Sequence, residues 1–130
     1  MEFEIKWKDR GYVAEFHGPC TMEEFINYHK NFSGDPRFDQ LEFSIVDVTD
    51  ADLSGIRMEE GVSLVALDYG ASMITLPYQK FALIATDPHA LKLSQYYKNE
   101  MERLETTWEI AIFPSQEDAM KWINQSHSAD

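Results

Sequence analysis

The sequence predicts an α/β domain in which a mixed, mostly parallel sheet of about five strands is flanked by about four helices. Three observations predict this class. The chain opens with two alternating apolar and polar stretches, later apolar runs are typical of covered strands, and capped amphipathic segments separate those runs. The resulting order is ββαβαβαβα. Because a helix separates each strand after the opening hairpin from the next, those strands should be parallel.

The opening hairpin should add an antiparallel edge strand to this sheet. Residues 3–7 and 12–16 alternate apolar with polar side chains, and they flank a turn that contains Gly11. A glycine can adopt the positive φ that tight hairpin turns require. We therefore expect the two segments to pair with each other.

A first helix should begin near Thr21. This residue and Glu24 have the spacing of a capping box, in which each side chain bonds to the backbone N–H of the other. The apolar stripe of this helix should consist of Met22, Phe25, Ile26 and His29.

The middle of the chain should contain a covered strand, a loop and a second helix. The strand is expected at residues 43–48 and the loop at 49–56. The helix is expected over residues 57–73, although Gly61 and Gly70 lower its intrinsic stability. One side of this helix should carry Met58, Val62, Val65, Tyr69 and Met73.

The last third of the chain predicts strand, helix, strand and helix. Residues 80–86 form the clearest buried strand, and Asp87 followed by Pro88 is a strong helix start. Residues 108–113 predict the final strand, and Ser115 should cap the final helix. The helices should bury Ala90, Leu93, Tyr97, Met101 and Leu104, and then Ala119, Trp122 and Ile123. We expect one domain over residues 1–124 and a polar tail over 125–130.

Charge and composition exclude several classes of function. The formal net charge is −12, which repels nucleic acid and anionic lipid surfaces. No apolar run is long enough to span a membrane, and the first residues do not resemble a secretion signal. The single cysteine, Cys20, allows no intrachain disulfide. These features predict a cytoplasmic protein.

The sequence resembles the SpoIIAA-like group of the bacterial STAS superfamily, whose domains are related in appearance to SEC14-like lipid-transfer domains. The resemblance is carried by Gly11-Tyr12-Val13 and Gly18 in the hairpin, by residues 81–88, and by residues 112–123. It covers nearly the whole chain, and it implies a STAS-like fold. It also implies a non-catalytic regulatory or protein-interaction module.

In the bacterial anti-sigma antagonists of this superfamily, a strand ends in an aspartate that is followed by a phosphorylatable serine and a helix. Asp47 matches the aspartate, but Val48 stands where the serine would be. A phosphate on the following segment would meet several carboxylates, and like charges disfavour it. The candidate switch loop consists of Asp47, Thr49, Asp50, Asp52 and Ser54.

Other chemical motifs are incomplete. Residues 50–55 reproduce half of a calcium loop, but Gly61 occupies the position of the essential bidentate glutamate. Local turns and helix capping explain these short polar side chains better. Cys20 has the spacing of a packing residue, and the four histidines lack metal-ligand spacing. We expect no catalytic residues, no metal and no cofactor.

The best candidate feature is the segment from Met58 to Tyr78, and an interaction module would use the region from Asp47 to Met73 as its working surface. Methionines adapt to irregular apolar partners, although they could equally fill the core here. We expect an apolar groove or interface formed by Met58, Val62, Val65, Tyr69, Met73 and Tyr78. An exposed apolar patch there would favour a homodimer or another protein partner. A sealed apolar cavity beside it would favour a carrier or sensor for a small apolar or lipid-like ligand.

Overall fold

The computed structural model describes residues 2–33, 36–37, 41–72 and 79–125 of the chain. The predicted tail therefore lies outside the described residues, apart from Gln125, as do Met73 and Tyr78 of the predicted groove. The elements are β1 (Glu2–Trp7), β2 (Gly11–Pro19), α1 (Met22–Ser33), β3 (Phe43–Asp52), the short 3-10 helix η2 (Met58–Glu60), α2 (Gly61–Ser72), β4 (Lys80–Ile84), α3 (Pro88–Arg103), β5 (Glu109–Phe113) and α4 (Gln116–Ile123).

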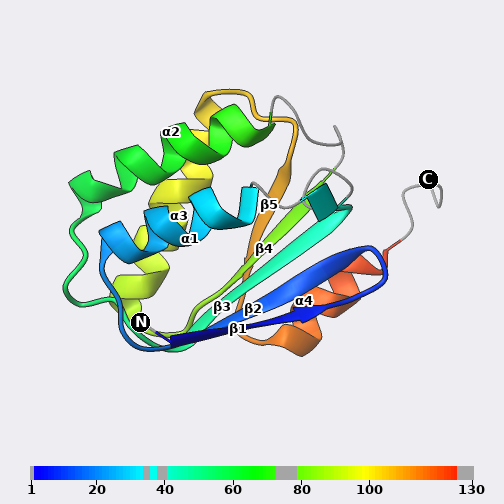
Figure 1. The fold of residues 1–130 in the computed structure, drawn as a ribbon, viewed down its shortest axis with the longest axis horizontal. Helices are drawn as coiled ribbons and strands as arrows, with labels where there is room; N and C mark the ends of the chain where they lie inside the picture. Colours follow the sequence, from blue (N-terminus) through cyan, green and yellow to red (C-terminus); the bar gives the residue numbers. More distant parts are fainter. Residues whose placement is uncertain (1, 34–35, 38–40, 73–78, 126–130) are drawn as a thin grey trace.

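The five strands form one mixed sheet in the order β1-β2-β3-β4-β5 (Figure 1). Strands β1 and β2 are antiparallel, with Ile5 opposite Ala14. The other neighbours are parallel, and Ile45 in the centre of the sheet is in register with Val13 of β2 and Ala82 of β4. The predicted element order and the mostly parallel sheet are therefore confirmed.

The helices cover the two faces of the sheet unequally. Helices α1, α2 and α3 lie on one face, and α4 covers the other (Figure 1). Alternation along the strands supplies both cores, because Tyr12 and Ala14 belong to the core under the three helices whereas Val13 belongs to the core under α4. The larger core contains Phe81 and Trp108, whose rings stack with centroids 5.7 Å apart.

Side-chain caps start the helices where the sequence predicts them. At α1, the Thr21 hydroxyl accepts a hydrogen bond from the Glu24 backbone N–H at 3.2 Å, and the Glu24 carboxylate accepts one from the Thr21 N–H at 3.0 Å. Asp87 caps α3 by accepting from two backbone N–H groups of its first turn. Ser115 caps α4 by accepting from the Asp118 N–H at 3.2 Å.

The predicted end of β3 is wrong. The sequence predicts a loop from Thr49 onward, but the strand continues to Asp52. The reason is that β2 is also long, and its last residues, from His17 to Pro19, pair with residues 50–52. A register shift between Glu15 and His17 lets the two strands stay paired over this distance.

The predicted stripe of the second helix is also partly wrong. Val62 points outward and is 55% exposed, whereas Val65 is buried. Helix α2 lies between α1 and α3, so it is covered along a face that includes Leu64 and Asp68. Apolar residues occur all around this helix, and their pattern did not identify that face.

Candidate functional site

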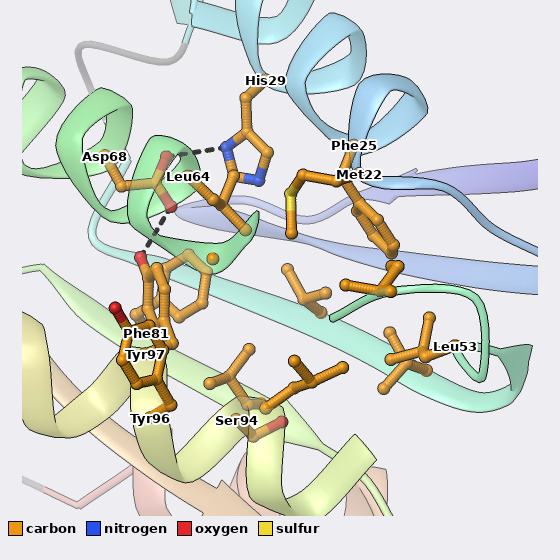
Figure 2. A pocket seen from close by; sticks show the side chains of 16 residues that line it. Met22, Phe25, His29, Leu53, Leu64, Asp68, Phe81, Ser94, Tyr96 and Tyr97 are labelled. Carbon is orange, nitrogen blue, oxygen red and sulfur yellow. Dashed lines mark hydrogen bonds and ion pairs between the residues drawn. The ribbon is translucent and has the colours of Figure 1, made fainter. Parts of the chain in front are cut away.

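An apolar pocket of about 90 Å³ lies between the three helices and the sheet (Figure 2). It is partly open to solvent, and strands β3 and β4 form its floor. Four aromatic rings contribute to its wall, from Phe25, Phe81, Tyr96 and Tyr97. The other lining residues are Met22, His29, Val46, Val48, Leu53, Ile56, Gly61, Leu64, Asp68, Leu83, Leu93 and Ser94.

One corner of this pocket is polar because three side chains from three helices meet there. Asp68 of α2 lies between His29 of α1 and Tyr97 of α3 (Figure 2). The Tyr97 hydroxyl donates a hydrogen bond to Asp68 Oδ2 at 2.6 Å. His29 Nδ1 lies 2.8 Å from Asp68 Oδ1. We call these three residues the polar corner.

Burial makes the partners of Asp68 essential. The residue is only 3% exposed, and an unpaired carboxylate in such a place would lose several kcal/mol of solvation. Each carboxylate oxygen instead faces one donor. The polar corner therefore joins α1, α2 and α3 at the pocket wall.

The proton positions of the polar corner follow from the chemistry of its groups. Burial, followed by the negative charge of Asp68, raises the pKa of Tyr97 well above 10.0, so its hydroxyl keeps its proton. An ionised carboxylate only accepts hydrogen bonds, so His29 Nδ1 carries a hydrogen. The second ring nitrogen, Nε2, is then either an acceptor or a donor, depending on the charge of the ring.

Nε2 of His29 is the free polar atom of the corner. The ring projects from α1 with Nε2 on the side away from Asp68, facing the pocket (Figure 2). Within the described part of the chain, no hydrogen bond reaches Nε2. A molecule in the pocket could therefore bond to this atom while Asp68 fixes the ring from behind.

Two more buried tyrosines lie near this corner. Tyr28 lies in α1, one residue before His29. Its hydroxyl donates a hydrogen bond to the hydroxyl of Tyr12 at 3.4 Å. Burial raises the pKa of both phenols, that of Tyr12 to about 12. Both groups therefore stay neutral, and they add no charge beside Asp68.

The segment between β3 and η2 borders the pocket on another side. Leu53 and Ile56 contribute apolar side chains to the lining. His89, in the first turn of α3, holds this segment because its Nε2 lies 2.7 Å from the Ile56 carbonyl oxygen. The segment is thus tied to α3, the helix that also supplies Tyr97.

The candidate switch residues form a separate polar group along the second half of β3 and just after it. Asp47 Oδ1 accepts hydrogen bonds from the backbone N–H and the hydroxyl of Thr49, at 2.9 and 2.7 Å. Its other oxygen accepts from Gln116 Nε2 at 2.7 Å, and the same nitrogen also donates to Glu15. This bond from Gln116, and then Lys6, lowers the pKa of Glu15.

The rest of the candidate switch residues are exposed and bond locally. Asp50 lies 3.8 Å from His17 across the strand pair. Asp52 accepts a hydrogen bond from the Ser54 backbone N–H at 2.9 Å, which is a local turn of the kind favoured from the sequence. In the part of the chain that the structure describes, no group of three or more His, Cys, Asp or Glu side chains could hold a metal ion.

Among the described residues, the predicted groove side chains do not line the pocket. Val65 is buried in the main core, Met58 and Tyr69 are half-buried, and Val62 points to solvent. Helix α2 contributes Gly61, Leu64 and Asp68 to the pocket instead. The pocket thus lies beside α2, but the side chains of this helix that line it are not the ones named from the sequence.

Sequence reasoning missed the polar corner, although one signal was present. Asp68 is the only charged residue of α2, whose other residues are mostly apolar or small. It is four residues from Leu64 and three from Val65, which places all three on one side of the helix. A lone carboxylate on an apolar helix face needs a buried donor, and His29 and Tyr97 were both predicted on buried stripes.

Cys20 does not have the surroundings of a nucleophile. It is 3% exposed, and its thiol donates a weak hydrogen bond to the Gly18 carbonyl oxygen at 3.4 Å. Burial raises the pKa of the thiol, which disfavours the reactive thiolate. The structure thus places Cys20 in the core, as its spacing predicts.

The fold is similar to that of a solved protein. The crystal structure of an uncharacterised protein from the DUF3478 family with a SpoIIAA-like fold, from Shewanella loihica PV-4, matches 94% of this chain and 92% of its own, with 14% identity and a TM-score of 0.55. No protein-family model and no curated protein matches the sequence. The likeness shows a SpoIIAA-like fold, as the residues of the hairpin and the later strands predict. Among the described residues, no helix has the length and apolar character needed to cross a membrane.

Proposed function

We propose that this protein is a non-catalytic binding module that holds a small, mostly apolar molecule in the pocket between α1, α2 and α3. The single observation that carries the proposal is the apolar pocket with one organised polar corner. Binding sites for small molecules are typically concave, apolar and equipped with a few fixed polar groups. In this proposal the module is a sensor or carrier of the STAS type.

The absence of a nucleophile beside the polar corner supports binding rather than catalysis. An aspartate that orients a histidine is half of a nucleophilic triad, which also needs a hydroxyl or thiol within about 3 Å of the other ring nitrogen. In the described part of the chain, no such group bonds to His29 Nε2. Ser94 lines the same pocket, but no hydrogen bond joins it to His29 among the described residues.

The second candidate function is an interaction module, which would need exposed apolar side chains to contact a partner. Among the described residues, the large exposed hydrophobic side chains are Phe3, Val62 and Leu91. They come from β1, α2 and α3 respectively. Single exposed apolar side chains are normal on protein surfaces. The pocket therefore favours the ligand-binding alternative over a homodimer or another protein partner.

Native mass spectrometry of protein purified from its own cells, together with thermal unfolding in the presence of toluene and phenol, tests the proposal. A ligand at about 100 times its Kd stabilises the folded state by about 2.7 kcal/mol. We expect a co-purified small molecule, or a rise in Tm with at least one probe. If no small molecule co-purifies and neither probe raises the Tm, the proposal is contradicted.

A pair of tryptophan substitutions on α2 identifies the pocket as the binding site. Leu64→Trp should fill the pocket, because Leu64 lines it. Val62→Trp places the same side chain on the same helix but at a position that is 55% exposed. We expect Leu64→Trp to abolish the stabilisation by the probes and Val62→Trp to preserve it. Equal retention in both variants would place binding elsewhere and contradict the proposal.

A further inference from the structure

The polar corner also defines the chemical class of the ligand. We infer that the pocket selects an uncharged, predominantly apolar molecule that carries a hydroxyl group, and that this hydroxyl bonds to His29 Nε2. The inference rests on the proposed function, and it adds the identity of the polar group.

The charges around the pocket disfavour an anionic ligand. Asp68 is already a buried carboxylate, and among the described residues that line the pocket there is no lysine or arginine. A bound carboxylate would share the single imidazole of His29 with Asp68. Two carboxylates that compete for one partner in an apolar site repel each other, and the formal net charge of −12 adds to that repulsion.

A cationic ligand lacks a partner for a different reason. Both oxygens of Asp68 already accept from groups of the protein, at 2.6 Å from Tyr97 and 2.8 Å from His29. A bound ammonium would reach the carboxylate only by displacing one of these donors. The displaced donor would then be a buried polar group without a partner.

A hydroxyl matches both states of His29. It can donate to Nε2 when the ring is neutral, and it can accept from Nε2–H when the ring is charged. Asp68 holds Nδ1, so the ring is oriented before the ligand enters. The remaining wall, which includes Phe25, Phe81 and Tyr96, suits an apolar body of about one ring in size.

Three probes that share one aromatic ring and differ in a single substituent test this inference. Phenol, toluene and benzoate share a ring but carry a hydroxyl, a methyl group and a carboxylate. Isothermal titration of the full chain should give phenol a Kd about 3- to 10-fold lower than that of toluene, which is the effect of one neutral hydrogen bond. Benzoate should bind most weakly. Binding of toluene or benzoate as tight as that of phenol would overturn the inference but leave the proposed function standing. Failure of all three probes to bind would contradict the proposed function itself.

His29→Asn provides the matched variant. The asparagine amide can replace the Nδ1 donor to Asp68, but it has no group in the place of Nε2. We expect the preference for phenol over toluene to disappear, while the Kd of toluene stays within about 2-fold of its original value. A preserved preference would contradict the role of Nε2.

A measurement on the unmodified protein covers the case in which this variant does not fold. The nitrogen NMR signal of His29 Nε2 should shift on addition of phenol and not on addition of toluene. An Nε2 signal that does not move with saturating phenol would also contradict the inference.

Discussion

Removing the hydroxyl of Tyr97 tests whether the polar corner holds the three helices together. Tyr97→Phe keeps the ring, which packs against Phe81 with centroids 5.6 Å apart. It removes only the donor that lies 2.6 Å from Asp68 Oδ2. The substitution therefore leaves one oxygen of a buried carboxylate without its partner.

The expected loss of unfolding free energy is about 2 kcal/mol. Hydrogen bonds to charged groups contribute about 1.5 to 3 kcal/mol to the stability. A buried acceptor that loses its donor costs a desolvation free energy of similar size. Water that enters from the adjacent pocket can solvate the freed oxygen, which favours the lower end of this range. For a chain of 130 residues, this corresponds to a fall in Tm of about 6 to 10 °C.

Urea unfolding followed by circular dichroism measures this loss, and Tyr96→Phe is the matched control. Tyr96 is the preceding residue of the same helix, and it also lines the pocket. In the described structure, its hydroxyl makes no hydrogen bond. We expect the control to change the stability by less than about 0.5 kcal/mol. Equal effects of the two substitutions would refute the reasoning, because the bond to Asp68 would then contribute nothing specific.

Three other predictions concern the core, the first residue of β2 and a helix cap. Burial raises the pKa of Tyr12 from 10.0 to about 12, so between these pH values the folded state holds a proton that the unfolded state has released. As the pH rises from 10 to 12, this proton should lower the stability by up to about 1.4 kcal/mol per pH unit, and the buried Tyr28 and Tyr97, whose pKa values are also raised, should add to the fall. Urea unfolding over that range measures it, and a constant stability would contradict the assignment. Gly11→Ala would place a Cβ against the Phe43 carbonyl oxygen and ring, and it should destabilise the fold by about 1 to 3 kcal/mol. Gly55→Ala meets no atom within 4 Å and serves as its control in the same thermal unfolding assay. Asp87→Ala removes the cap of α3 and should lower the unfolding free energy by about 1 kcal/mol in urea, and an unchanged midpoint would show that the cap is dispensable.

Local sequence chemistry was sufficient to predict the order and the starts of the elements. The capping box at Thr21 and the cap at Asp87 depend only on residues within a few positions, so the sequence contains the whole signal. The end of β3 depends on a partner instead. Residues 50–52 are polar, and they remain in the strand because the long β2 pairs with them.

The candidate site was harder to predict because it combines distant segments. His29, Asp68 and Tyr97 meet only when three helices pack on the same face of the sheet. Periodicity showed that two of these residues face inward, but it gives no distances between helices. In α2, apolar residues surround the helix on every side, so its buried face depended on the packing of α1 and α3 rather than on its own pattern.

The order of the sheet has a consequence for how the chain assembles during synthesis. Each strand pairs with the strand that precedes it, so a chain that emerges from the ribosome can extend the sheet one strand at a time. Asp68 is made before Tyr97, and its second donor arrives only with α3. Once α3 has been made, every residue that lines the pocket is present. Helix α4 has not yet been made, so the opposite face of the sheet, with Val13 and Ile45, is still uncovered. The last helix therefore covers the second apolar face only at the end of synthesis, and it contributes no residue to the lining of the pocket.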